Sequence, residues 1–311
     1  MNSYNLFIIE ALTPMHVGSG DITYGVVDNL IQRNPVTKIP VINASSLKGS
    51  LREHFEKKIK ASDTINALNE EEIKYLFGKS TEIKTEDDEK ATTIKSDSEP
   101  GRMIVFEANL LTLPLRSSQK VYYNATSPQI LKDYLKYYEL FISKPNENNM
   151  FNNVLEKFVN PQLTNKDFVI FEDLRGLEIE DFDKGEKFTT KDKDTDTKFE
   201  NFLKTVFQLD PSSLAIFNDK IFSSICERKL PVIARNQIDD EKGTSKNLFY
   251  EEVLPRCAIL YFYLGEEKVN STSNGYYDKI KQYITADNEV IQIGANYSIG
   301  YGFTKMREVT P

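Results

Sequence analysis

Hydrophobic residues along the chain gather first into strand-like runs. Asn5–Leu12 is a β-rich apolar run that ends at Thr13-Pro14, and Tyr24–Arg33 mixes alternation with a central apolar stretch. A shorter apolar run follows at Ile39–Ile42. Apolar runs of this length, bounded by proline and polar residues, predict strands.

Helix-like stripes come next. Ser45 or Ser46 suits the N-cap of a helix, because a serine side chain can accept a hydrogen bond from a backbone N–H of the first turn. Downstream apolar residues recur every four positions and predict one buried face: Leu47, Leu51, Phe55 and Ile59. Further helical patterns lie at Glu71–Phe77, Leu131–Phe141, Val154–Val159 and Tyr276–Ile284.

Later strands are predicted from similar runs. Arg102–Leu115 is a long strand pattern broken at Pro114, and Leu230–Leu264 contains two strands around a charged turn at Asp239–Thr244. Glu289–Ile293 and Gly302–Val309 are strand patterns on either side of a glycine-rich loop. Strands and helices alternate without regular βαβ spacing or repeats, which favours a single α+β domain, residues 1–311, with insertions.

Composition narrows the class of protein. The chain has 311 residues, 40% hydrophobic and 28% charged, as in globular proteins. No apolar run is long enough to span a bilayer, and residues 2–5 lack the basic-then-apolar layout of a signal peptide, so we expect a cytoplasmic protein with no membrane partner. Cys226 and Cys257 are too far apart in sequence to suggest a zinc site or a disulfide framework, and both are expected to be small buried residues.

The net charge of −8 argues at first against a nucleic-acid partner. However, the segments 56–100 and 172–200 carry −4 and −5, and the other residues sum to +1. Both segments have the polar composition of insertions. We expect a flexible loop over Ser80–Pro100 and an exposed, partly disordered stretch over Lys184–Lys198. The acidity therefore does not exclude RNA binding by the remaining domain.

The predicted helix start carries a candidate anion site. Lys48 and Arg52 are four residues apart and share one helical face, Ser46 lies in the first turn, and Gly49 lets a backbone approach closely. Free N–H groups and the helix dipole add to the attraction for a phosphate. The alternative is an ordinary amphipathic helix with two solvated cations.

The glycine-rich loop Gly294–Gly302 is a second candidate. Its glycines allow positive φ and can present backbone N–H groups to phosphates, with Lys305 following. It is neither a Walker loop, because no Gly-Lys-Ser/Thr ends it, nor a dinucleotide fingerprint, because the strand–helix context is absent. The alternative is a tight hairpin with no ligand. The residues proposed to bind here are Gly294, Asn296, Gly300, Gly302 and Lys305.

A third motif runs from Thr13 to Gly20 and on to Gly25–Asp28. It contains His16, one of two histidines, and Asp28 after two valines near a strand end. An aspartate in this position is more often a turn or cap residue than a catalytic one. A Ser19–His16–Asp28 triad can be drawn, but nothing resembling a nucleophile elbow supports it.

Taken together, the motifs resemble the RAMP superfamily of CRISPR proteins, and more narrowly the repeated backbone subunit of the type III-B (Cmr) effector complex. The resemblance rests on the His16 motif, Gly25–Arg33 and Ile39–Arg52, and extends to Leu113–Ser117, Asn247–Pro255 and Ile291–Gly294. Two departures stand out. Ala295 and Ser298 replace a family Gly and Thr, which makes positive φ at residue 295 costly, and Glu107 replaces a usual Asp, so it is assigned no metal role.

The resemblance implies a modified ferredoxin-like (RRM-like) palm with a β-hairpin thumb, placed at residues 230–255. Copies of such a subunit stack along a guide RNA (crRNA) beside other Cmr subunits, and each thumb displaces one nucleotide in every six. Ser46, Lys48, Gly49 and Arg52 would hold guide phosphates together with the glycine loop. Guide–target pairing, rather than these contacts, would read the sequence.

The resemblance also implies a metal-dependent endoribonuclease that cuts target RNA. The family's catalytic aspartate falls on Asp28, which would hold Mg²⁺ or Mn²⁺ or orient a 2′-hydroxyl. His16 could transfer protons, or it could have a structural or guide-binding role. Glu251 and Tyr250 are candidates for a second residue that takes part in catalysis. Three alternatives remain: a non-catalytic crRNA-binding scaffold, a precursor-guide processing enzyme, and, remotely, an unrelated α/β hydrolase-like enzyme.

Overall fold

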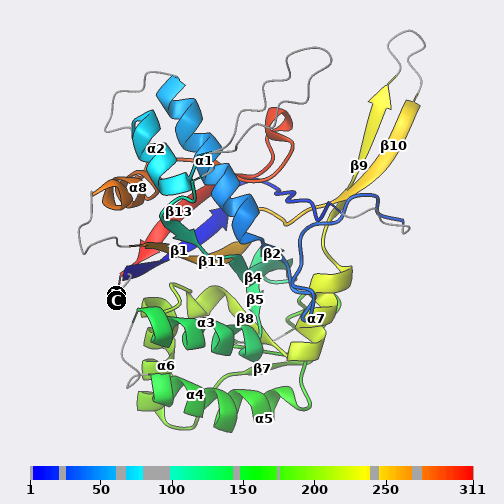
Figure 1. Ribbon diagram of the computed structural model, residues 1–311. Coiled ribbons are helices and arrows are strands. Elements are labelled where there is room, and N and C mark those ends of the chain that lie inside the picture. The colour runs from blue at the N-terminus through cyan, green and yellow to red at the C-terminus, as the bar shows by residue number, and fades with distance from the viewer. Residues whose placement is uncertain are drawn as a thin grey trace, which may run out of the picture.

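A computed structural model of the chain describes residues 3–20, 26–60, 68–79, 99–142, 148–173, 176–238, 245–267 and 275–310. One large mixed β-sheet runs through the molecule. Helices α1 (Ala44–Lys60), α2 (Glu70–Phe77) and α8 (Tyr276–Ile284) lie on one side of its central strands, and α3 (Pro128–Phe141) lies on the other (Figure 1). The predicted α+β class is confirmed.

The first strand, β1 (Ser3–Ala11), is central in the sheet. It pairs antiparallel with both β11 (Ile259–Glu266) and β13 (Phe303–Val309), so that Leu6 lies opposite Tyr263 on one side and Val309 on the other. Its apolar residues, Leu6 to Ile9, are completely buried. Since helices cover both faces of this strand, a continuous apolar run replaces the alternation of a half-exposed strand.

The sheet order is β12-β13-β1-β11-β4-β5-β8-β6-β7, with β2 beside β4 and β3 beside β11. Most pairs are antiparallel, but β5–β8 and β6–β7 are parallel. The remaining strands of this sheet are β2 (Val41–Ile42), β3 (Met103–Val105), β4 (Ala108–Arg116), β5 (Tyr122–Thr126), β6 (Phe168–Ile170), β7 (Gly185–Lys187), β8 (Leu214–Phe217) and β12 (Ile291–Gln292).

Helix α1 differs from its prediction at its start. It begins at Ala44, and the Leu47 N–H bonds the Asn43 carbonyl, so Ser45 and Ser46 lie inside the first turn instead of capping it. The predicted stripe is confirmed for Leu47, Leu51 and Phe55, which are buried, while Ile59 is partly buried against the core. Helices α2, α3 and α8 form where they were predicted, and α8 has the predicted bounds.

A second group of helices lies on the far side of α3 (Figure 1). Aromatic rings fill the space between them, with Phe151 stacked on Phe199 at 4.6 Å between ring centroids. The predicted helix at Val154–Val159 is part of a longer helical segment that includes one π-helical turn. The elements of this group are α4 (Asn148–Val154), the π-helix Leu155–Val159, α5 (Asn160–Leu163), α6 (Lys193–Thr205) and the 3₁₀ turn Pro211–Ser213. Helix α7 (Asp219–Arg228) lies apart from them, at the level of α3 (Figure 1).

The stretch predicted to be exposed and partly disordered, Lys184–Lys198, is instead ordered. It contains β7 and the first turns of α6, and Phe188 is buried. Two of its aspartates hold the start of α6: Asp192 is the N-cap and accepts from the Asp194 N–H, and Asp196, inside the helix, accepts from the Thr190 N–H at 2.8 Å. Most of the predicted loop Ser80–Pro100 lies outside the described residues.

Two strand predictions are wrong in detail. The described part of Tyr24–Arg33 makes only isolated bridges, each with a different partner: Ile31 with Gly18, Asn29 with Glu251, and Arg33 with Pro40.

The strand predicted at Arg102–Leu115 breaks between β3 and β4, not at Pro114. Pro114 fits inside β4 because β11 pairs only as far as Thr112, so the proline borders a ladder on one side.

Residues 230–255 contain two strands on either side of the predicted turn, as the sequence predicts. Strands β9 (Val232–Ile238) and β10 (Ser245–Glu252) form a separate two-stranded antiparallel sheet. This hairpin projects away from the rest of the molecule (Figure 1). The predicted charged turn Asp239–Thr244 lies outside the described residues.

The two cysteines are both free thiols. Cys226 is buried as predicted, and burial raises its thiol pKa to about 12. Cys257 is only half-buried, so its predicted burial is wrong. It also has a positive φ of 67°.

Among the described residues, no helix combines the length and apolar character needed to cross a bilayer.

Candidate RNA-binding and catalytic surface

The segment after β1 passes between the base of the hairpin and the glycine loop. Met15 exchanges two backbone hydrogen bonds with Leu254, which follows β10, each 2.9 Å long. On the other side, the Ala295 N–H bonds the His16 carbonyl at 2.9 Å, and the Gly302 N–H bonds the Pro14 carbonyl at 2.9 Å. Three segments that are distant in sequence are therefore held together by main-chain bonds.

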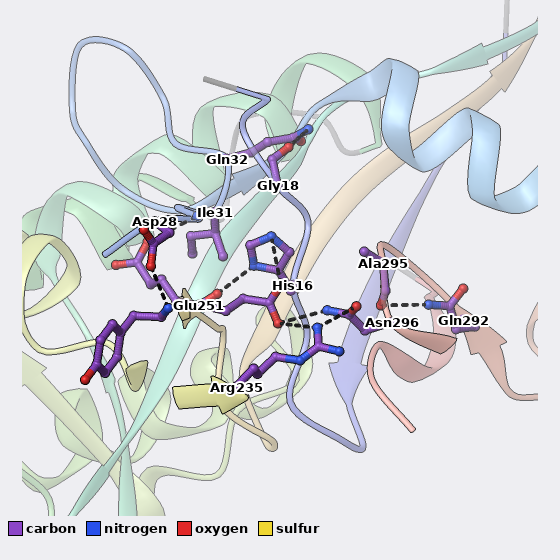
Figure 2. Close-up of polar contacts among 12 residues, drawn as sticks. His16, Gly18, Asp28, Ile31, Gln32, Arg235, Glu251, Gln292, Ala295 and Asn296 are labelled. Atoms are coloured by element: carbon purple, nitrogen blue, oxygen red, sulfur yellow. Dashed lines mark hydrogen bonds and ion pairs between the residues drawn. The ribbon is translucent and has the colours of Figure 1, made fainter. Parts of the chain in front are cut away.

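His16 lies inside this junction, with only 5% of its surface exposed. Its Nδ1 is 2.7 Å from the Glu252 carbonyl oxygen, and its Nε2 is 3.7 Å from Glu251 Oε1 (Figure 2). Both ring nitrogens therefore face the end of β10. The Ser19–His16–Asp28 triad is not assembled, because the two His16 nitrogens face Glu252 and Glu251.

Glu251 joins the hairpin to the glycine loop. Its side chain is 4% exposed, and Oε2 accepts from Asn296 Nδ2 at 2.8 Å and from Arg235 Nη1 at 3.3 Å. The same Arg235 Nη1 donates to Asn296 Oδ1 at 2.8 Å, so three side chains close a triangle (Figure 2). Arg235 was not among the predicted site residues. The only sequence signal for Arg235 is that it lies in the predicted hairpin. In the structure it lies opposite Phe249, and its guanidinium is 5.2 Å from the centroid of the Phe249 ring.

Asp28 lies at the surface, next to the base of the hairpin (Figure 2). Its Oδ2 accepts from the Tyr250 N–H at 2.7 Å, and its own N–H donates to the Tyr250 carbonyl at 3.0 Å. The Asn29 N–H bonds the same carbonyl at 3.1 Å. The Tyr250 side chain is 37% exposed. The structure thus brings Asp28, Tyr250, Glu251 and His16 to the base of the hairpin, with Asp28 and Tyr250 exposed and Glu251 and His16 buried.

A single buried glutamine ties the helix start to this junction. Gln32 Nε2 donates to the Ser46 hydroxyl at 2.9 Å and to the Gly18 carbonyl at 3.1 Å, and Gln32 Oε1 accepts from the Asn43 N–H at 2.7 Å. Ser46 is therefore held through Gln32. Sequence reasoning missed Gln32, since an isolated glutamine carries no signal without its partners.

Helix α1 presents its cations on two opposite flanks. Lys48 Nζ donates to the Met103 carbonyl of β3 at 2.9 Å, and burial, followed by the nearby Arg52 charge, lowers the Lys48 pKa. Arg52 bonds Glu56 at 2.7 Å. Ser50 lies two residues from both, about 200° around the helix, and faces the other way.

The other flank of α1 faces the glycine loop across a cavity of about 360 Å³. Its walls include Ser50, Lys57, Gln292 and Tyr297, and the Lys57 ammonium lies 5.1 Å from the centroid of the exposed Tyr297 ring. The helix and the glycine loop therefore do line one surface. Its helix side is formed by Ser50, Glu53, His54, Lys57 and Lys58, and not by Lys48 and Arg52 as predicted. Lys57 pairs there with Glu53 at 2.7 Å.

The glycine loop turns tightly and uses much of its own backbone. Gly294, Gly300 and Gly302 have positive φ, and a Cβ on Gly302 would lie 2.0 Å from the Ile293 carbonyl oxygen. The left-handed residue after Gly294 is Asn296, with φ 66°, so the strain predicted at Ala295 does not arise. Many loop N–H groups already donate within the protein: those of Ala295, Ile299, Gly300, Tyr301 and Gly302.

The last two predicted binding residues lie apart from this junction. Gly49 is exposed in α1 and has open space around it. Lys305 is half-buried on β13, and its nearest carboxylate, Asp287, is 4.0 Å away. Neither residue is bonded to the His16–Glu251 cluster by any contact among the described residues.

The donor set around Asp28 does not form a metal cage by itself. Across the described ranges of the chain, no group of three or more His, Cys, Asp or Glu side chains is arranged to hold an ion. One exposed carboxylate suits Mg²⁺ or Mn²⁺ only if other oxygen ligands complete the shell.

Comparisons with known proteins agree with one another. The family model of the RAMP superfamily matches residues 8–305. The chain is 30% identical over 310 residues to the CRISPR system Cmr endoribonuclease Cmr4 of Pyrococcus furiosus, covering 97% of this chain and 95% of that protein. The fold is similar to a chain of the type III-B Cmr-β complex bound to cognate target RNA, with a TM-score of 0.69, 21% identity, and coverage of 98% and 97%. Oligomeric Cmr4 from Pyrococcus furiosus gives a TM-score of 0.66 and 25% identity, with both chains fully covered.

Proposed function

The chain belongs to the RAMP superfamily, and we propose that it is a backbone subunit of a type III-B CRISPR effector complex that binds guide RNA and cleaves the paired target RNA. The observation that carries this proposal is the place of Asp28: an exposed carboxylate fixed at the base of a projecting hairpin. The names of the relatives support it, since one is an endoribonuclease and another belongs to a complex bound to target RNA.

We further interpret the central sheet as a ferredoxin-like palm. Its order, β13-β1-β11-β4, and the positions of α1 after β1 and α8 after β11 agree with the βαββαβ pattern. In this interpretation β9–β10 is the thumb. A projecting two-stranded ribbon is suited to enter between guide and target and to splay the RNA chain.

The guide backbone would lie along α1 and the glycine loop. Lys57 and Lys48 provide cations on the two flanks of α1, and the exposed Tyr297 ring offers a stacking surface. Phosphate contacts position RNA without reading its bases, so we expect little dependence of affinity on guide sequence. Since the loop N–H groups are largely engaged within the protein, side-chain cations would supply most of the attraction.

Cleavage would follow from geometry at the displaced nucleotide. Splaying the chain lets a 2′-hydroxyl align with the neighbouring phosphate, which an A-form duplex prevents. Asp28, at the surface, is placed to orient that hydroxyl or to share a divalent ion with phosphate oxygens. A bound ion would offset the negative charge that develops on the phosphate. His16 and Glu251 are buried, which supports a role in holding the site over direct contact with RNA.

The test is cleavage by an assembled complex containing Asp28→Asn. We expect guide binding to be retained and cleavage at six-nucleotide intervals to be lost. Asp183→Asn, an exposed aspartate between β6 and β7, is the matched control and should cleave normally. Normal cleavage by Asp28→Asn would contradict the catalytic assignment and leave a guide-binding scaffold. Loss of cleavage in EDTA, with recovery in Mg²⁺ or Mn²⁺, would separately test metal dependence.

A further inference from the structure

We infer that Arg235 is a positioning residue for the cleavage proposed above, acting on Asp28 through Glu251 and Tyr250. The inference rests on that proposed function, but its evidence is separate. Arg235 lies on β9, Glu251 on β10, and Asn296 in the glycine loop, so their triangle joins the hairpin base to the body of the protein.

The first step is the hold on Glu251. Its carboxylate is almost completely buried, and Oε2 receives both the Arg235 guanidinium and the Asn296 amide, while Oε1 faces His16 at 3.7 Å. A buried carboxylate needs a paired cation and hydrogen bonds to stay buried. Among the described residues, Arg235 is the arginine or lysine that pairs with Glu251, at 3.3 Å. This pair is therefore one of the contacts that hold the end of β10, beside the Arg33–Glu252 pair at 2.6 Å.

The second step leads from Glu251 to Asp28. Successive residues of a strand point to opposite faces, so when Glu251 faces inward, Tyr250 faces outward. The Tyr250 backbone is bonded to residues 28 and 29 by three hydrogen bonds of 2.7, 3.0 and 3.1 Å. A shift of β10 at Glu251 would therefore carry Tyr250, and Asp28 with it.

Arg235 is itself well fixed. Its guanidinium lies 5.2 Å from the centroid of the Phe249 ring on the neighbouring strand, directly across the hairpin. Both polar contacts come from one nitrogen, Nη1, which donates to the Asn296 oxygen and to the Glu251 carboxylate. Lysine, a point charge, could keep the ion pair but not the same planar geometry.

The experiment compares Arg235→Gln and Arg235→Lys in the assembled, guide-loaded complex. Single-turnover cleavage at saturating target should fall by about 10- to 100-fold in Arg235→Gln, since displacement of a reacting group by about 1 Å can cost this much. Arg235→Lys should recover part of the rate. Guide and target affinities should not change, because Arg235 acts on Asp28 and not on RNA. Arg228→Gln, an exposed arginine on α7, is the matched control and should cleave normally.

Asn296→Gly is the second variant if Arg235→Gln folds poorly. Glycine tolerates the φ of 66° at this position and removes only the amide, so it should lower the rate in the same direction. Normal cleavage by Arg235→Gln, or loss of guide affinity together with the rate, would overturn the positioning role. Normal cleavage by Asp28→Asn would contradict the proposed function itself, independently of the results for Arg235. Normal cleavage by Arg235→Gln, with cleavage lost in Asp28→Asn, would contradict only the positioning role.

Discussion

The Tyr250 backbone N–H and the Asp28 carboxylate form a 2.7 Å hydrogen bond between the hairpin and the segment that follows β1. The donor is main chain, so no substitution at residue 250 other than proline removes it. The acceptor is a side-chain oxygen, which asparagine also has. The charge of Asp28 can therefore be removed while its structural bond is kept.

Asp28→Asn should leave the free energy of unfolding almost unchanged, whereas Asp28→Ala should lose about 1 kcal/mol, the usual worth of one hydrogen bond. Urea unfolding of the isolated chain measures both. Equal destabilisation by Asn and Ala would mean that the charge of Asp28, and not its oxygen, holds the hairpin base.

The Arg33–Glu252 pair should be a major source of stability. The two groups are 2.6 Å apart and largely buried, and Glu252 Oε2 also accepts from the Ile31 N–H. Glu252→Gln should cost about 3 kcal/mol, because it leaves the Arg33 charge buried without its partner. Chemical denaturation gives the loss.

The Arg102–Glu267 pair offers a matched control for this prediction. It has a similar distance of 2.7 Å, but both side chains are well exposed. Glu267→Gln should therefore have a much smaller effect than Glu252→Gln. Equal effects would show that burial does not set the strength of the Arg33 pair.

Glycine substitutions should separate strained positions from open ones. Gly302→Ala should cost at least about 2 kcal/mol, because φ is +75° and the new Cβ would overlap the Ile293 carbonyl. Gly49→Ala should instead gain about 0.5–1 kcal/mol, since Gly49 lies in a helix with open space around it. Thermal unfolding compares the two, and a stabilised Gly302→Ala would contradict the loop geometry.

Acidification should destabilise the protein through His54. This imidazole is 2.8 Å from Glu289, and burial lowers its pKa, outweighing the opposite effect of Glu289. The unfolded chain then binds the proton more readily, so stability is present above the ordinary histidine pKa of 6.5 and falls as the pH drops below it. Denaturation at pH 7.5 and 5.5 should show a smaller difference in His54→Gln than in the unmodified chain.

Elements governed by local pattern could be predicted from the sequence. The apolar stripe of α1, the bounds of α8 and the buried run of β1 depend on residues close in the chain. The segment 26–33 could not be predicted, because each of its bridges uses a different partner, and one of these, Glu251, is far away in the sequence. The strand break predicted at Pro114 was wrong for a similar reason. Only the pairing of β4 with its neighbours shows that the missing N–H of Pro114 costs little stability.

The candidate site divides in the same way. Asp28 and His16 were found because the family motif surrounds them, and the structure brings both to the hairpin base. Arg235 and Gln32 were missed because their meaning depends on partners about 60 residues and 14 residues away, Asn296 and Ser46. The face of α1 that meets the glycine loop was misjudged by half a helical turn, since both flanks carry lysine.

The central position of β1 also bears on how the chain folds during synthesis. Both neighbours of β1 come late in the chain: β11 begins at Ile259 and β13 at Phe303. Until the ribosome has made them, the apolar residues Leu6 to Ile9 have no strand beside them, and such exposed edges promote aggregation. Contacts this distant in sequence also slow folding. The emerging chain should therefore depend on a chaperone to shield β1 until β11 and β13 have been synthesised.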